Sequence, residues 1–285
     1  MSWEVYDDRP CTLGEGPIWH RAHGQLLWFD IVAGRLLSGG DGAREWTFDE
    51  PASAAAELAD GRVLVATATG LTILDLASDA CEPFVSLEAD DPATRSNDGR
   101  PDPWGGLWIG TMGFDAEPEA GAIYRVTGRE VRTLFPRISV PNGICFAPDR
   151  SVAYLADSAI GVIWRQPLDE DGWPDGAREI FVDDGPAGLP DGAVCDADGY
   201  VWSARWGGSC VLRFAPDGRL DHRVDLPTAQ VTCPAFGGEG FDTLYVTTAR
   251  QGLDAESLAE QPHAGQTFRV LGTVPGRPEP LFIPD

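Results

Sequence analysis

The sequence predicts an all-β fold, and within that class a six-bladed β-propeller with four antiparallel strands in each blade. Short β-rich runs separated by Gly, Pro and Asp turns fill the chain of 285 residues, and no amphipathic helix of ordinary length interrupts them. Six apolar strand-like segments recur at spacings of about 36 to 48 residues, a repeat typical of propeller blades. These segments are 26–30, 63–67, 107–111, 153–157, 201–205 and 244–248.

Each repeat contains three further strand-like runs around its aligned segment. In the fourth repeat "GICFAP" precedes "AYLAD", and "GVIWRQPL" and "EIFV" follow it. The aligned segments are apolar on both faces, as expected where each blade packs against two neighbours. We therefore predict a single propeller domain over residues 1–285. Two packed β-sandwiches are the alternative, which the regular repeat disfavours.

The strand that completes the last blade has two possible sources. "PLFI" (280–283) follows the sixth repeat as a fourth strand would, whereas "WEVYD" (3–7) also resembles an outer strand. Either segment alone, or both together, would close the ring.

Only two asparagines occur in the sequence, Asn97 and Asn142. Counting back 11 to 13 residues from each aligned segment reaches a position near the start of the first strand of that repeat. These positions are Glu15, Ala52, Asn97, Asn142, Asp191 and Cys233. Because first strands line the central channel of a propeller, the four polar side chains are expected to converge there. The alternative is that they are ordinary turn residues next to Gly.

The convergent side chains predict a metal site. Two carboxylates and an amide oxygen on one axis repel each other unless a cation lies between them. Oxygen ligands favour hard divalent ions such as Ca²⁺, Mg²⁺ or Mn²⁺. Three protein ligands leave coordination positions open, which indicates catalysis or substrate binding rather than a closed structural site.

Composition excludes several classes of function. The chain has no Lys, so its 21 basic residues are all Arg, which rules out Schiff-base lysines and Walker-type phosphate loops. A net charge of -24 and a pI near 4.3 oppose binding to nucleic acid or anionic membrane. No apolar run approaches the roughly 20 residues that span a bilayer, and no signal peptide is visible, so a cytoplasmic protein is expected. We expect a monomer by default.

Cysteine and histidine spacing gives no further site. The six cysteines include no CxxC pair, so free and mostly buried thiols are expected. The four histidines show no HxxxH or HExxH spacing and no Ser/His/Asp order. A histidine-based metal centre or catalytic triad is therefore not predicted.

Several longer motifs occur in a specific order. These are "LGEGPIW" around Glu15, "RSNDG" leading into "DPWGGLWIGTM", then "PNGICFAPD", "PDGAVCDADGYVWSARWGG" and "TTARQGL". On these motifs the chain resembles the senescence-marker-protein, regucalcin and gluconolactonase family of six-bladed propellers, especially its bacterial sugar-lactone lactonases. The resemblance covers nearly the whole chain.

The resemblance implies roles for five residues. Glu15, Asn142 and Asp191 would hold one divalent metal ion, with Ca²⁺ preferred and Mg²⁺, Mn²⁺, Zn²⁺ or Fe²⁺ as alternatives. Arg95 and Asn97 would contact the substrate. Family members often have a further acidic substrate contact after "GTM", for which Asp115 and Glu117 are both candidates here.

The function expected from these residues is metal-dependent hydrolysis of a small-molecule sugar lactone to its aldonic acid. In this hypothesis a metal-activated water attacks the lactone carbonyl, and Asp191 is both a ligand and the catalytic proton acceptor. Two alternatives remain open: an esterase or phosphotriesterase-like hydrolase acting on a non-sugar substrate, and a calcium-binding propeller without catalysis.

Overall fold

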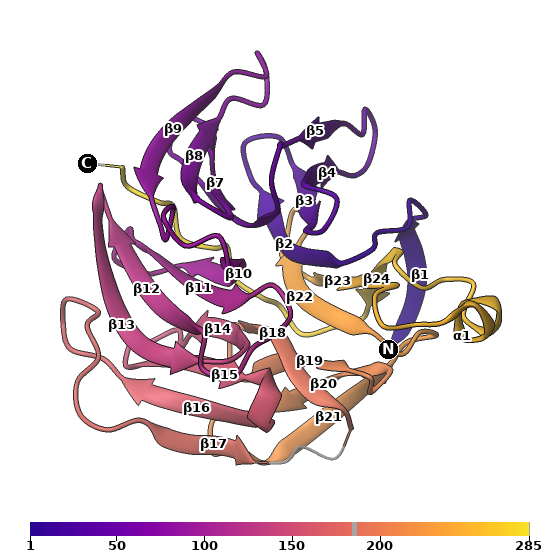
Figure 1. Ribbon diagram of the computed structural model, residues 1–285. Coiled ribbons are helices and arrows are strands. Elements are labelled where there is room, and N and C mark those ends of the chain that lie inside the picture. The colour runs from indigo at the N-terminus through magenta and orange to yellow at the C-terminus, as the bar shows by residue number, and fades with distance from the viewer. Residues whose placement is uncertain (184–186, 285) are drawn as a thin grey trace.

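The predicted six-bladed β-propeller is confirmed. The computed structural model describes residues 1–183 and 187–284, and these residues form six four-stranded antiparallel sheets arranged as blades around a centre (Figure 1). The first strands of neighbouring blades contact each other around the central channel.

Blades 1 to 3 follow the predicted repeats. Blade 1 comprises β2 (Gly14–His20), β3 (Gln25–Asp30), β4 (Arg35–Ser38) and β5 (Glu45–Thr47). Blade 2 comprises β6 (Ala52–Glu57), β7 (Val63–Thr67), β8 (Gly70–Leu74) and β9 (Cys81–Ser86). Blade 3 comprises β10 (Thr94–Pro101), β11 (Leu107–Gly113), β12 (Gly121–Thr127) and β13 (Glu130–Ile138).

Blades 4 to 6 complete the ring. Blade 4 comprises β14 (Pro141–Phe146), β15 (Val152–Asp157), β16 (Val162–Pro167) and β17 (Glu179–Asp183). Blade 5 comprises β18 (Leu189–Cys195), β19 (Val201–Trp206), β20 (Cys210–Phe214) and β21 (Leu220–Asp225). Blade 6 comprises β22 (Val231–Gly237), β23 (Thr243–Thr248), β24 (Thr267–Leu271) and β1 (Ser2–Asp7).

The N-terminal strand closes the last blade. β1 pairs antiparallel with β24, so the outer strand of blade 6 is the segment that contains "WEVYD". Because the first and last strands of the chain pair in one sheet, strand hydrogen bonds hold the ring together.

The segment 275–283, which contains "PLFI", is not a blade strand but crosses the end of the channel. Its backbone bonds with residues 197, 241, 105 and 57, which lie in four different blades. We call this segment the C-terminal strap. Glu279 of the strap pairs with Arg100 of β10 at 2.9 Å, and Phe282 is buried between blades 2 and 3.

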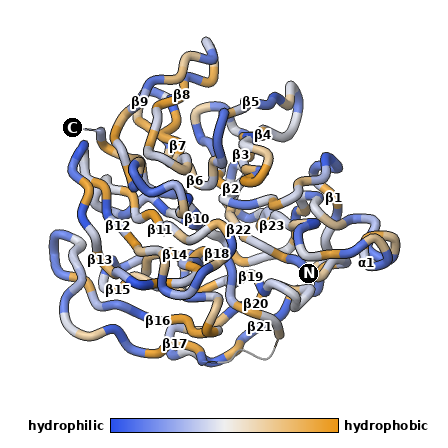
Figure 2. Tube along the Cα trace, viewed as in Figure 1, coloured by the Kyte–Doolittle hydropathy of each residue, from blue (hydrophilic) through white to orange (hydrophobic). Residues whose placement is uncertain are grey.

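Apolar packing between blades explains why apolar and polar residues do not simply alternate along the aligned segments. In β3, Leu26 and Trp28 pack toward blade 6, whereas Leu27 and Phe29 pack toward blade 2. Each of the six blade interfaces has its own buried cluster of this kind. Figure 2 shows hydrophobic stretches along the blade strands and hydrophilic stretches in many of the peripheral loops.

Helical structure is confined to the loops in the described part of the chain. A 3-10 turn (Ser158–Ile160) follows β15, and α1 (Ala255–Glu260) lies between β23 and β24. Within residues 1–183 and 187–284, no helix is long and apolar enough to cross a membrane. All six cysteines are free, and five of them are buried, with Cys81 exposed.

The strap gives a stability prediction. We expect Phe282→Ala to lower the free energy of unfolding by about 3 kcal/mol, because truncating a buried aromatic side chain removes its contacts and leaves a cavity. Urea unfolding followed by circular dichroism measures this change. Ile283→Ala is the matched control, since Ile283 is 56% exposed and its truncation should change stability by no more than about 0.5 kcal/mol. Equal effects of the two substitutions would contradict an anchoring role for Phe282.

Candidate functional site

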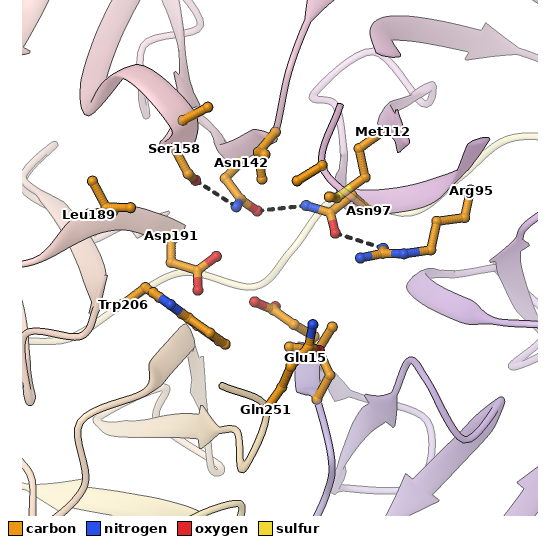
Figure 3. Close-up of a pocket in the computed structure, with 14 residues that line it drawn as sticks. Glu15, Arg95, Asn97, Met112, Asn142, Ser158, Leu189, Asp191, Trp206 and Gln251 are labelled. Atoms are coloured by element: carbon orange, nitrogen blue, oxygen red, sulfur yellow. Dashed lines mark hydrogen bonds between the residues drawn. The ribbon is translucent and has the colours of Figure 1, made fainter. Parts of the chain in front are cut away.

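The polar side chains selected from the sequence do converge. Glu15, Asn97, Asn142 and Asp191 lie on β2, β10, β14 and β18 and line one cavity of about 320 Å³. Arg95 lines the same cavity. Figure 3 shows the five side chains directed toward one another from these separate strands.

A shared irregularity of the inner strands places these side chains. In every blade the pairing between the first and second strands shifts at the channel position or immediately beyond it, as in a β-bulge. Aligning the six strands on this pairing gives the equivalent set Glu15, Ser53, Asn97, Asn142, Asp191 and Thr232. The sequence alignment was therefore correct in four blades and wrong by one residue in blades 2 and 6, where it selected Ala52 and Cys233.

In blades 1, 4 and 5 the last residue of the aligned segment anchors the loop that enters the inner strand. Asp30 accepts hydrogen bonds from the backbone N–H groups of residues 12 and 13 at 3.0 and 3.1 Å. Asp157 accepts the equivalent bonds from residues 139 and 140 at 2.9 and 3.0 Å. In blade 5 the position is Arg205, whose guanidinium donates to backbone carbonyl groups of the loop before β18. These bonds fix the backbone just before each candidate ligand.

A chain of hydrogen bonds joins blades 3, 4 and 5 across the cavity wall. Arg95 Nη1 donates to Asn97 Oδ1 at 2.9 Å, and Asn97 Nδ2 donates to Asn142 Oδ1 at 3.1 Å. Asn142 Nδ2 donates to Ser158 Oγ at 2.8 Å, and this hydroxyl donates to the carbonyl of Pro190 at 2.6 Å. The orientation of each amide is therefore set by partners on both sides.

Glu15 and Asp191 face each other on the opposite side of the cavity. Both are buried, at 6% exposure each, and a hydrogen bond links their carboxyl groups. Burial, followed by the nearby charge of Asp98, raises the pKa of Glu15 to about 8. Burial and the charge of Glu15 raise the pKa of Asp191 well above its ordinary value. The charged forms of both groups are thus unfavourable without a compensating cation.

The donor set fits a divalent metal ion with oxygen ligands. Glu15 and Asp191 supply carboxylates, and Asn142 contributes an amide oxygen. Among the described residues no group of three or more His, Cys, Asp or Glu side chains is placed to hold a metal, which excludes a thiolate or imidazole centre there. The mixed set of two carboxylates and one amide matches a hard ion and balances its charge.

The acidic candidates after "GTM" do not line the cavity. Ala116 lies in the wall, whereas Asp115 and Glu117 on either side of it are exposed. Glu117 instead accepts a hydrogen bond from the backbone N–H of Asp115 at 3.2 Å. The structure therefore places neither carboxylate at the cavity wall.

Gln251 is a cavity residue that was not selected from the sequence, and Trp206 is a lining residue outside the expected set of metal ligands and substrate contacts. Gln251, in the loop after β23, lines the cavity, and Trp206 at the end of β19 forms part of its wall. The "TTARQGL" and "VWSARWGG" motifs contain these residues, but neither motif reveals which side chain turns toward the channel. The remaining wall is largely apolar and includes Leu13 and Met112.

A six-bladed propeller with oxygen donors converging at one end of its channel is the class of protein that this fold and site define. The sequence model of the SMP-30/gluconolactonase/LRE-like region matches residues 13–250, and the chain belongs to this family.

Similarity to individual proteins extends over the full length. The chain is 38% identical to the 6-deoxy-6-sulfogluconolactonase of Pseudomonas putida, covering 96% of both proteins. It is 38% identical to the L-arabinolactonase of Azospirillum brasilense, covering 92% of this chain and 89% of the relative. The crystal structure of a calcium-binding protein, regucalcin, from Agrobacterium tumefaciens superposes with a TM-score of 0.96 at 41% identity, covering 99% of this chain and 97% of that one.

The buried carboxyl pair predicts stabilisation by divalent metal. Ca²⁺ at about 100 times its dissociation constant should stabilise the wild-type protein by about 2.7 kcal/mol, because the ion binds only the folded site. Thermal unfolding in EDTA and in Ca²⁺ measures the shift in midpoint. Glu15→Gln should lose most of this shift, whereas Asp115→Asn, an exposed control, should keep it. A full Ca²⁺ shift in Glu15→Gln would contradict a role for Glu15 in binding metal.

Proposed function

We propose that this protein hydrolyses a sugar lactone to the corresponding aldonic acid, using one divalent metal ion held by Glu15, Asn142 and Asp191. The observation that carries the proposal is the convergence of these three oxygen donors on one cavity that Arg95 also lines. The names of the relatives support the reaction, since two of them are called lactonases of sugar-derived substrates.

The metal ion, when bound, would supply Lewis acidity toward a carbonyl oxygen and lower the pKa of a bound water molecule. Ca²⁺ is the preferred candidate, and the calcium-binding relative of known structure supports this choice. Mg²⁺, Mn²⁺, Zn²⁺ and Fe²⁺ are the alternatives to be compared with it.

Asp191 is the proposed catalytic base. Its carboxyl group lies at the cavity wall within hydrogen-bonding contact of Glu15, so one oxygen can serve as a ligand while the other accepts the proton of the attacking water. Attack on the lactone carbonyl forms a tetrahedral intermediate, and cleavage of the ring C–O bond opens it. The proton held by Asp191 then passes to the leaving alkoxide, which gives a hydroxyl and a carboxylic acid. The acid releases its remaining proton to solvent and leaves as the carboxylate.

Arg95 and Asn97 are the proposed substrate-binding pair. The Arg95 side chain is buried, and in the part of the chain that the structure describes no carboxylate lies within 4.0 Å of it. Its Nη1 is oriented by Asn97, which leaves Nε and Nη2 available to oxygen atoms of a ligand. These donors can stabilise negative charge that develops on the substrate oxygen, together with hydroxyl groups of the ring.

A non-catalytic calcium-binding propeller is the second candidate function. The Agrobacterium tumefaciens protein is described as a calcium-binding protein, and the donor set would serve the same purpose here. The two candidates differ in one respect: only the lactonase requires Asp191 to accept a proton.

The test is hydrolysis of glucono-, galactono-, xylono- and arabinono-lactones by EDTA-treated protein, followed in a pH-stat with single divalent ions added back. We expect turnover above the spontaneous rate with at least one lactone and one ion. Asp191→Asn should lower kcat by about 100-fold or more, because proton transfer by a positioned base contributes this much. Asp115→Asn should retain wild-type activity.

Two results would contradict the proposal. Folded protein that binds metal but hydrolyses none of the four lactones would favour the calcium-binding function. Near-normal turnover by Asp191→Asn with metal bound would remove Asp191 from its catalytic role and leave lactone hydrolysis itself intact.

A further inference from the structure

Most polar groups in the cavity wall either belong to the proposed metal site or already have hydrogen-bond partners in the protein. Glu15, Asn142 and Asp191 form the proposed metal site. Ser158 Oγ both donates to Pro190 and accepts from Asn142. A substrate must therefore find most of its hydrogen bonds elsewhere.

The amide of Asn97 is nearly saturated as well. Its Nδ2 donates to the carbonyl of Pro141 at 3.0 Å and to Asn142 Oδ1 at 3.1 Å, which occupies both N–H groups. Its Oδ1 accepts from Arg95, so one lone pair is left for a ligand. On this side of the cavity, Arg95 supplies nearly all of the free donors.

Gln251 is the other lining residue with free hydrogen-bonding capacity. Its side-chain amide has no hydrogen-bond partner in residues 1–183 and 187–284, so it can offer two donors and an acceptor. Its backbone, in contrast, is held in place: its N–H donates to the carbonyl of Thr12 at 2.9 Å. Gln251 is thus a free amide on an anchored backbone at the cavity.

Trp206 lies beside this amide. The backbone N–H of Gly207 donates to Gln230 Oε1 at 2.8 Å, and Trp206 and Gln230 form a β-bridge, which positions the indole. Gly252, the neighbour of Gln251, lies against the same ring, since a Cβ added there would be 3.7 Å from it. In Figure 3 Trp206 lies beside Asp191, away from Arg95, and Gln251 lies beside Glu15.

The loop that carries Gln251 is tied to two other blades. It runs from β23 to β24 and includes α1, and residues 250 and 251 both donate to Thr12 ahead of blade 1. Farther along, Gln261 Oε1 accepts from the backbone N–H of Ala229 at 2.6 Å, at the end of blade 5. Anchors on both sides give Gln251 a defined position, as a specificity residue requires.

We infer that Gln251 and Trp206 form a second recognition edge that selects among sugar lactones, an inference that rests on the proposed function. Gln251 hydrogen-bonds a ring or side-chain hydroxyl of the substrate, and Trp206 packs on the apolar C–H face of the ring. The substrate class is a polyhydroxylated lactone with hydroxyls at both edges. A lactone without a hydroxyl at the Gln251 edge leaves this amide without a partner.

The experiment compares the wild-type protein with Gln251→Ala on the best aldonolactone and on γ-butyrolactone, which carries no hydroxyl. Gln251→Ala should lower kcat/KM for the aldonolactone about 10-fold, mainly through KM, because one neutral hydrogen bond is lost. Hydrolysis of γ-butyrolactone should be unchanged. Trp206→Leu should raise KM for both ring substrates, because both pack on the indole.

A binding readout and a matched control accompany the kinetics. The aldonate product should bind metal-loaded Gln251→Ala about 10-fold more weakly than wild type by isothermal titration calorimetry. Glu260→Ala changes an exposed residue of the same loop and should alter neither measurement. All variants should keep the wild-type midpoint of thermal unfolding, except for a modest decrease in Trp206→Leu.

The outcomes separate this inference from the proposed function. Wild-type hydrolysis with an unchanged preference between the two lactones in Gln251→Ala would overturn the role of Gln251 and leave the lactonase assignment standing. An unchanged KM for both lactones in Trp206→Leu would overturn the role of Trp206. Wild-type protein that hydrolyses no lactone would overturn both the inference and the function on which it rests.

Discussion

Two carboxyl groups buried against each other, Glu15 and Asp191, set the main constraint on this structure. Burial raises the pKa of both groups, and so do the charge of Asp98 at Glu15 and the charge of Glu15 at Asp191, so the folded chain holds a site whose charged form needs a cation. The propeller keeps the pair together because each residue sits on an inner strand fixed by packing with neighbouring blades. Packing between the blades thus holds the two carboxyl groups close together, although their charged forms repel each other.

The floor of the channel contributes to the same constraint. Asp98 lies below the carboxyl pair, and the buried Arg100 guanidinium donates to the carbonyl of Ala193 at 2.7 Å and pairs with Glu279 of the C-terminal strap at 2.9 Å. One buried guanidinium, that of Arg100, therefore lies between the acidic groups of the candidate metal site and the acidic group of the strap. Because the strap covers that end, substrate has access to the site from the cavity side, where Arg95, Trp206 and Gln251 lie.

The fold could be predicted because apolar segments recur along the sequence at a regular spacing. The six aligned segments became the second strand of each blade with boundaries correct to within about two residues, since burial on both faces demands continuous apolar sequence. The residue of each first strand that faces the channel was predicted less accurately. Hairpin lengths differ between blades, so counting back from the second strand selected Ala52 and Cys233 where the pairing places Ser53 and Thr232. Gln251 escaped prediction because loop conformation, rather than periodicity, turns it toward the cavity.

The two asparagines occupy positions that a carboxylate or a hydroxyl could not fill equally well. At position 97 the side chain must donate twice, to Pro141 and Asn142, and also accept from Arg95, which Asp cannot do. At position 142 a neutral oxygen can face the metal site while the amide nitrogen donates to Ser158. Asp there would lose that donor and add a third negative charge beside Glu15 and Asp191. Two carboxylates already balance the charge of a divalent ion. The two neutral amides can therefore add a ligand oxygen and orienting hydrogen bonds without adding a further buried charge, which would be unfavourable.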